Sequence, residues 1–155
     1  MDRQAEFERA FRAQIERFRD PLRDGLRKLR RVKPPAGAAF VMFEIYSDWR
    51  SFPISSFAFD RRGNEVSVDT PFHGSRLAIR GELIPGGVID QDAFEEDGVA
   101  TFESGARILA ELFRQCWQAA GGEGFSLPAY IKHHDRGTAL DLRTGEWVST
   151  KSLWG

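Results

Sequence analysis

Cysteine is almost absent from the sequence, which has one, Cys116, in 155 residues. A single cysteine cannot form an internal disulfide, and it excludes a cysteine-rich zinc site. Long apolar runs are absent too, since nothing approaches the roughly 18 apolar residues of a membrane span. The charged first residues also lack the apolar segment of a secretory signal. We therefore expect a cytoplasmic protein without membrane contact, whose fold depends on packing alone.

Known catalytic and nucleotide-binding motifs are missing as well. The chain has no Walker-type glycine-rich loop, no dinucleotide-binding fingerprint, no nucleophile elbow and no His-Glu-x-x-His segment. The sequence accordingly assigns no catalytic residue, no cofactor and no metal. It favours a protein that is not an enzyme.

Apolar material for one core is present. Hydrophobic residues make up 41% of the chain and charged residues 29%, which excludes a disordered or low-complexity protein. A chain of this length buries about 70% of the surface that its unfolded form exposes. We expect one domain spanning residues 1–155.

Two regions show the spacing of amphipathic helices, in which apolar residues recur every three or four positions. The first, a helical segment within 3–33, covers 3–19 and 21–31. A break or kink is expected at Asp20-Pro21, because proline disfavours helical dihedrals in the residue before it. The second region covers 102–120 and ends at two glycines. The apolar positions of the first region are Phe7, Phe11, Ile15, Phe18, Leu22, Leu26 and Leu29.

Short apolar or alternating segments elsewhere predict strands. Helices and strands in this order are typical of an α+β protein. We expect a single antiparallel sheet of about five to seven strands, with the helices on one face. The expected strands are 38–46, 54–59, 65–70, 76–84, 126–133, 139–142 and 146–150, with a hairpin loop over 60–64 and an acidic loop over 88–98.

Glu44 is the most unusual side chain of the first predicted strand. If this strand is regular, Glu44 shares a face with Phe40 and Met42, where a carboxylate needs a cation or hydrogen-bond donors. One hypothesis is a ligand pocket, and the alternative is a structural ion pair with Arg50 or Arg80. The residues of the hypothetical ligand pocket are Glu44, Tyr46, Trp49, Arg50, Tyr130 and His133.

The stretch His133-His134-Asp135 is the most metal-like part of the sequence, and His73 is a further potential ligand. Adjacent residues of a strand point to opposite faces, however, so both histidines can bind one ion only beyond the end of the strand. We therefore expect one histidine to pack or cap the strand, the other to meet solvent, and no metal.

Charge is distributed unevenly, although the net charge is only −1. Residues 1–33 hold 11 Lys and Arg against 6 Asp and Glu, whereas residues 34–155 hold 11 against 17. The basic run is favoured as a solvated helix face, and a protein contact or a contact with nucleic acid or anionic membrane are the alternatives. The basic residues could equally lie against the acidic part of the same chain or of a second copy. The predicted partner-binding surface is acidic: Asp90, Asp92, Glu95, Glu96 and Asp97.

These observations favour a small interaction protein that binds a protein partner and performs no chemistry. Its charge and layout would suit an inhibitor or immunity-type protein acting on a basic enzyme, by analogy alone. The alternative is a small-molecule-binding protein or modest enzyme with a pocket around Glu44, Tyr46, Trp49 and Arg50. Nucleic acid is a weaker alternative, and the N-terminal helix could also join two copies in a homodimer.

Overall fold

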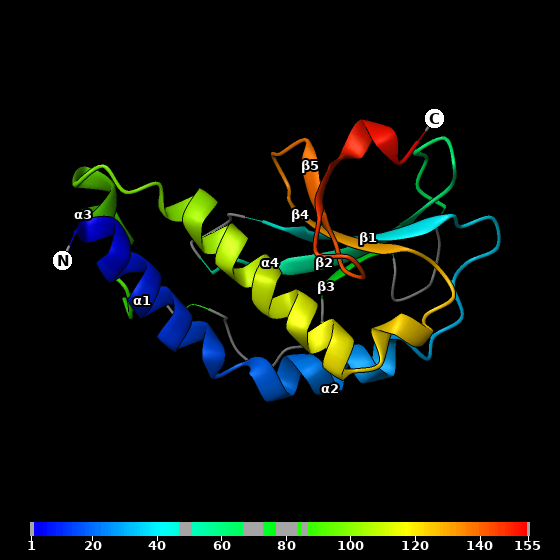
Figure 1. Ribbon diagram of the computed structural model, residues 1–155, viewed down its shortest axis with the longest axis horizontal. Helices are drawn as coiled ribbons and strands as arrows, with labels where there is room; N and C mark the ends of the chain where they lie inside the picture. Colours follow the sequence, from blue (N-terminus) through cyan, green and yellow to red (C-terminus); the bar gives the residue numbers. More distant parts are fainter. Residues whose placement is uncertain (1, 47–50, 67–72, 77–83, 85–86, 155) are drawn as a thin grey trace.

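The described strands form a single sheet, and the helices pack against it (Figure 1). The computed structural model describes residues 2–46, 51–66, 73–76, 84 and 87–154, with only the backbone at 73–76. Within this part the helices are α1 (Arg3–Glu16), α2 (Arg19–Leu29), α3 (Gln91–Glu96) and α4 (Thr101–Ala119), with the 3-10 turns η2 (Gly122–Gly124) and η3 (Thr150–Ser152). The strands are β1 (Phe40–Ile45), β2 (Ile54–Phe59), β3 (His73–Arg76), β4 (Ala129–His133), β5 (Thr138–Asp141) and β6 (Trp147–Ser149). The protein is therefore α+β with a single sheet, as the sequence predicts.

The sheet is mixed, so the prediction that it is antiparallel throughout is wrong. Its strands lie in the order β3, β2, β1, β4, β5, β6, and β1 runs antiparallel to β2 but parallel to β4. The chain reaches β4 through α4, and a helical crossover of this kind brings a strand back in the same direction. The spacing of apolar residues reports the face on which each lies and not the direction of the strand. The sequence pattern therefore could not show the parallel pair.

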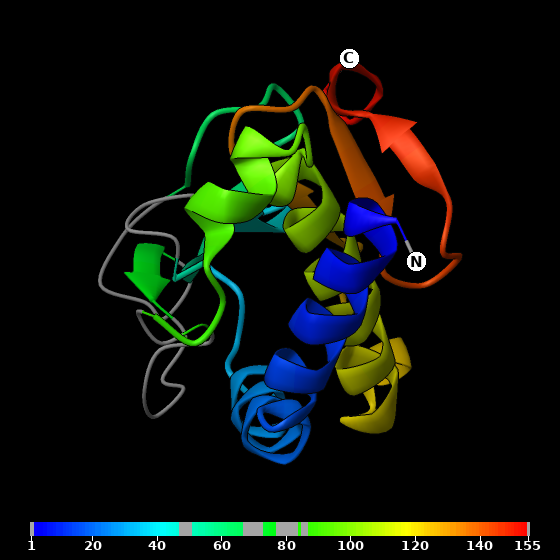
Figure 2. The ribbon, with the colours of Figure 1, turned by 90° about the vertical axis from the view of Figure 1, so that its left-hand side faces the viewer.

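The N-terminal helical segment is interrupted between α1 and α2, at Arg17 and Phe18. Pro21 does not mark the interruption itself, because it lies in the first turn of α2, where a backbone N–H has no helical partner to lose. Asp2 caps the start of α1, and its carboxylate accepts a hydrogen bond from the N–H of Ala5 at 2.7 Å. Both helices pack against α4, and Figure 2 shows α1 beside it.

The main core lies between the helices and one face of the sheet. Phe7, Phe11 and Ile15 of α1 are buried within the chain itself, so this stripe leaves no free apolar surface for a second copy. α4 comes close to its neighbours because Gly105 has no side chain. A Cβ at that position would stand 2.7 Å from the ring of Phe52.

The opposite face of the sheet carries a second, smaller apolar cluster. Phe40, Met42 and Ala139 are buried there. The ring of Trp154, which follows η3, lies 6.2 Å from that of Phe40 between centroids. The C-terminal segment therefore covers part of the sheet face that the helices leave open.

The described segment after β2 contains β3, which pairs antiparallel with β2 and shares only Arg76 with the strands predicted at 65–70 and 76–84. Glu65 forms an isolated antiparallel bridge with Phe59, so the chain does turn back on itself after β2. The remaining residues of the two predicted strands, 67–70 and 77–83, lie outside the described residues.

The prediction of an acidic loop over 88–98 is wrong, because this segment contains α3. Asp90 caps this helix, and its carboxylate accepts a hydrogen bond from the N–H of Ala93 at 3.1 Å. Asp92 lies in the first turn, where a carboxylate interacts favourably with the helix dipole. Six residues are too few to show a helical apolar stripe, so the acidic capping residues were the available signal.

Candidate functional site

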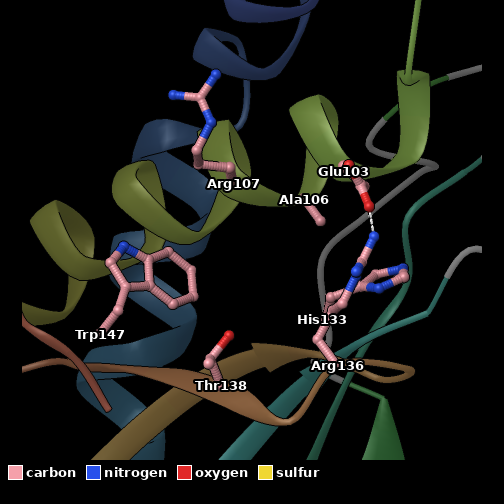
Figure 3. A pocket seen from close by; sticks show the side chains of 7 residues that line it. All are labelled: Glu103, Ala106, Arg107, His133, Arg136, Thr138 and Trp147. Carbon is pink, nitrogen blue, oxygen red and sulfur yellow. Dashed lines mark ion pairs between the residues drawn. The ribbon is translucent and has the colours of Figure 1, made fainter. Parts of the chain in front are cut away.

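A cavity lies between the N-terminal half of α4 and the last three strands (Figure 3). Its volume is about 310 Å³, and it is formed where the chain leaves the carboxyl end of β4 and turns into β5. Trp147 stands at one end, His133 and Arg136 at the other, and Thr138 between them (Figure 3). The lining residues are Glu103, Ala106, Arg107, His133, Arg136, Thr138 and Trp147.

Two arginines line the cavity, and each is matched by a carboxylate. Arg136 forms an ion pair with Glu103, and the two side chains are 53% and 55% exposed. Arg107 pairs with Glu8 of α1 at 2.7 Å, and its guanidinium points away from the cavity (Figure 3). Arg136 is therefore the arginine that the cavity offers to a ligand.

His133 contributes a half-buried imidazole. Both of its ring nitrogens are buried, and neither has a hydrogen-bond partner among the described residues. It stands opposite Ile45 in the sheet, on the helix side, and its ring lies 6.4 Å from that of Phe102. Burial lowers the pKa of His133 from its ordinary value of 6.5, which favours the neutral imidazole. A neutral imidazole offers one hydrogen-bond donor and one acceptor.

Trp147 supplies an aromatic wall. It lies on β6, the last strand of the described sheet, opposite Leu140 of β5. Trp147 is 45% exposed and lines the cavity, and small-molecule sites are lined largely by hydrophobic and aromatic side chains. Together with Arg136, it gives the cavity one flat apolar side and one cationic end.

Sequence reasoning named one of the cavity residues, His133, and missed the others. Glu103 and Arg107 are four residues apart on α4, which puts them on one helix face. Arg136 and Trp147 belong to the turn before β5 and to β6. No local pattern joins these segments, because they meet only once α4 packs beside the end of the sheet.

Glu44 lies in a separate polar cluster on the other face of the sheet. Its carboxylate accepts a hydrogen bond from the hydroxyl of Tyr46 at 3.0 Å. The same carboxylate lies 3.8 Å from Nζ of Lys132 and 3.6 Å from Nδ1 of His134. The ring centroids of Tyr46 and His134 are 4.4 Å apart. With only 15% of the Glu44 side chain exposed, these partners match the ionic and hydrogen-bonding needs of a half-buried carboxylate.

The residues of the hypothetical ligand pocket do not all meet. Glu44 and Tyr46 lie together, and Tyr130 shares their face of the sheet because it pairs with Met42. The ring of Tyr130 packs in the second apolar cluster, edge-on to the ring of Phe40. His133 faces the opposite side of the sheet, as alternation along β4 requires.

Trp49, Arg50 and Arg80 lie outside the described residues. The neighbours that sequence reasoning missed are Lys132 and His134. Alternation places both on one face of their strand, but only the register of β4 with β1 shows that this face also carries the carboxylate. The expectation that the adjacent histidines part to opposite sides agrees with their observed contacts.

Some carboxylates of the acidic surface also make contacts within the protein. Glu95 accepts a hydrogen bond from the hydroxyl of Thr101 at 2.6 Å, and Asp97 forms an ion pair with Arg3 at 2.6 Å. The carboxylate of Glu96 makes no hydrogen bond or ion pair with any described residue. All members of the surface are exposed: Asp90, Asp92, Glu95, Glu96 and Asp97.

The basic run lies elsewhere. α2 packs against α4, and along it Arg23 pairs with Asp20 and Asp24, while Arg27 also pairs with Asp24. α3 adjoins the start of α1, whereas α2 continues from its end (Figure 1). The basic helix α2 therefore does not cover the acidic surface of its own chain.

No group of three or more His, Cys, Asp or Glu side chains in the described part is arranged to hold a metal ion. Among the helices of that part, none has the length and apolar character needed to cross a membrane. Comparison with known proteins gave no match to a family model, a curated protein or a solved structure. The functional assignment therefore depends on the geometry and charge of these sites.

Proposed function

We propose that the protein binds a protein partner through its acidic surface and has no enzymatic role. The observation that supports this proposal is the exposure of all five carboxylates, with the basic α2 packed elsewhere on the chain. Exposed charge of one sign attracts a partner of opposite sign before contact is made. The expected partner surface is basic, as on an enzyme neutralised by an inhibitor or immunity-type protein.

The acidic surface is presented on a fixed element. Arg3 of α1 pairs with Asp97 and with Glu6, each at 2.6 Å, and its guanidinium carbon lies 4.2 Å from the ring centre of Phe94. These contacts join α3 to α1. A surface held in this way loses little conformational freedom when a partner binds.

An exposed apolar side chain adjoins the charges. Val88 is 52% exposed and lies two residues before Asp90. Exposed charge pairs are weakened by salt, so a stable complex also needs apolar contact. We expect Val88 to provide part of that contact.

The substitution Glu96→Lys tests the proposal with little structural disturbance, because Glu96 makes no polar contact with a described residue. Glu123→Lys is the matched control: it changes the net charge equally, at an exposed position in η2, far from α3 (Figure 1). The wild type and both variants would be immobilised and exposed to lysate from cells that produce the protein. Retained proteins would be quantified at low salt and at about 0.5 M salt, where surface attraction is screened.

We expect the wild type and Glu123→Lys to retain the same basic protein. Glu96→Lys should retain about tenfold less of it at low salt, and the high-salt wash should lower retention by the wild type and Glu123→Lys. Equal retention by Glu96→Lys and the wild type would contradict the proposal, as would retention of no basic protein.

A further inference from the structure

We propose that the cavity beside α4 binds a small planar aromatic carboxylate, with its ring against Trp147 and its carboxylate on Arg136. The site shares no residue with the acidic surface, so the inference does not rest on the proposed function. It also differs from the cluster around Glu44, which lies on the other face of the sheet.

The cationic end of the cavity is suited to a carboxylate. Arg136 already pairs with one, that of Glu103. Both side chains are more than half exposed, and ion pairs of this kind contribute little to stability. A ligand carboxylate can therefore replace Glu103 on Arg136 at low cost, through the two parallel hydrogen bonds that a guanidinium forms.

The opposite end is suited to a flat apolar group. Trp147 presents its indole to the cavity, and across from it α4 carries the small side chain of Ala106 (Figure 3). A small residue on the helix leaves room for a ring between α4 and β6. Aromatic rings prefer offset-stacked or edge-to-face contact with an indole, and these geometries suit a planar ligand better than a bulky one.

His133 adds a polar contact at the cationic end. It lies with Arg136 at one end of the cavity, because the turn after β4 is closed by a hydrogen bond from the N–H of Arg136 to the carbonyl of His133. Its two ring nitrogens have no hydrogen-bond partner in the part of the chain that the structure describes, and buried polar atoms in native proteins nearly always have a partner. When Arg136 turns from Glu103 to a ligand, an oxygen of that ligand can accept a hydrogen bond from the imidazole.

The size of the cavity limits the ligand. A volume of about 310 Å³ is at the lower end of the range for small-molecule pockets. A ligand of one or two rings is of a size that this volume accommodates.

The test is calorimetric titration of the full chain with 2-naphthoate. Two analogues separate the ligand features: 2-naphthalenemethanol keeps the rings without the charge, and cyclohexanecarboxylate keeps the charge without the flat ring. Three variants separate the protein features, namely Arg136→Gln, Trp147→Leu and Glu103→Gln. Arg143→Gln, at an exposed position outside the cavity, is the control.

We expect 2-naphthoate to bind the wild type and Arg143→Gln equally, and both analogues to bind at least about tenfold more weakly. Arg136→Gln and Trp147→Leu should each weaken binding by about tenfold, whereas Glu103→Gln should strengthen it, because the competing carboxylate is removed. A general loss of structure would weaken binding in both Arg136→Gln and Glu103→Gln, so opposite changes in affinity point to a direct role of the two side chains. Absence of binding to the wild type, or equal binding of the alcohol, would overturn the proposal.

Discussion

At the scale of single residues, Cys116 shows how burial suppresses the chemistry of a thiol. Its side chain is buried, and its Sγ donates to the carbonyl oxygen of Arg19 at 3.6 Å. Burial raises the pKa of the Cys116 thiol from 9.0 to about 11. This change lowers the thiolate fraction near pH 8 about a hundredfold.

Alkylation therefore distinguishes the folded from the unfolded protein. We expect iodoacetamide to label Cys116 readily in concentrated urea and hardly at all in native buffer at the same pH, as read by mass spectrometry. Rapid labelling of the native protein would mean that this part of α4 does not face the core.

His133 gives the stability of the protein a pH dependence. Because burial lowers its pKa below the ordinary 6.5, the unfolded chain binds more protons than the folded chain between the two pKa values. This residue should leave the free energy of unfolding unchanged above about pH 7 and reduce it as the pH falls below 6.5.

His133→Phe removes the titration and keeps an aromatic ring beside Phe102. Urea unfolding of the wild type and the variant, measured from about pH 8 to about pH 5, isolates the effect of this residue. The variant should become more stable relative to the wild type below pH 6.5. A difference that stays constant over the whole range would show that His133 titrates as it does in the unfolded chain.

Residue spacing predicted only part of the polar cluster around Glu44. Alternation along one strand predicts that Glu44 and Tyr46 lie on one face, and their side chains are hydrogen-bonded. That Lys132 and His134 join them follows from the pairing of β1 with β4, two segments far apart in the chain. The sequence contains the residue types, but their meeting depends on the register between strands, which a spacing pattern within one strand does not carry.

At the scale of secondary-structure elements, two helical glycines predict opposite effects of the same substitution. A Cβ at Gly105 of α4 would lie 2.7 Å from the ring of Phe52 and 2.9 Å from that of Phe11. A Cβ at Gly25 of α2 would meet nothing within 4 Å. Packing leaves no room for a methyl group at Gly105, whereas there is room for one at Gly25.

We expect Gly105→Ala to destabilise the protein by about 1–3 kcal/mol, because overpacking outweighs the better helix propensity of alanine. Gly25→Ala should stabilise it by up to about 1 kcal/mol. Urea unfolding of the two variants and the wild type measures both changes. A stabilising Gly105→Ala would show that α4 does not approach α1 and Phe52 as closely as described.

Elements with strong periodicity were predicted within a few residues. The helix expected over 102–120 is α4, and the strand expected over 38–46 contains β1, because each has enough apolar residues to show its period. The sequence pattern did not predict α3, because its six residues are too few to show the spacing of an amphipathic helix. The parallel pairing of β1 with β4 was missed because apolar alternation is the same in both strand directions.

At the scale of the whole molecule, the basic helix α2 lies away from the acidic surface, although Arg3 of the basic N-terminal segment pairs with Asp97 of that surface. The acidic surface lies on α3 beside the start of α1, and the basic α2 continues from the far end of α1 (Figure 1). Composition showed that residues 1–33 are basic and the remainder acidic. Composition could not show whether the basic segment lies against the acidic surface, since that depends on how α1 and α2 pack against α4.

Partner binding at the acidic surface is the central claim, and site-specific photo-crosslinking tests it most directly. A photoreactive benzoylphenylalanine would replace Glu96 in one sample and Glu123 in another, in cells that produce the protein. We expect irradiation to join position 96 to a single protein through a peptide rich in Lys and Arg, and position 123 to give no such product. Equal products from both positions, or none from position 96, would contradict the claim.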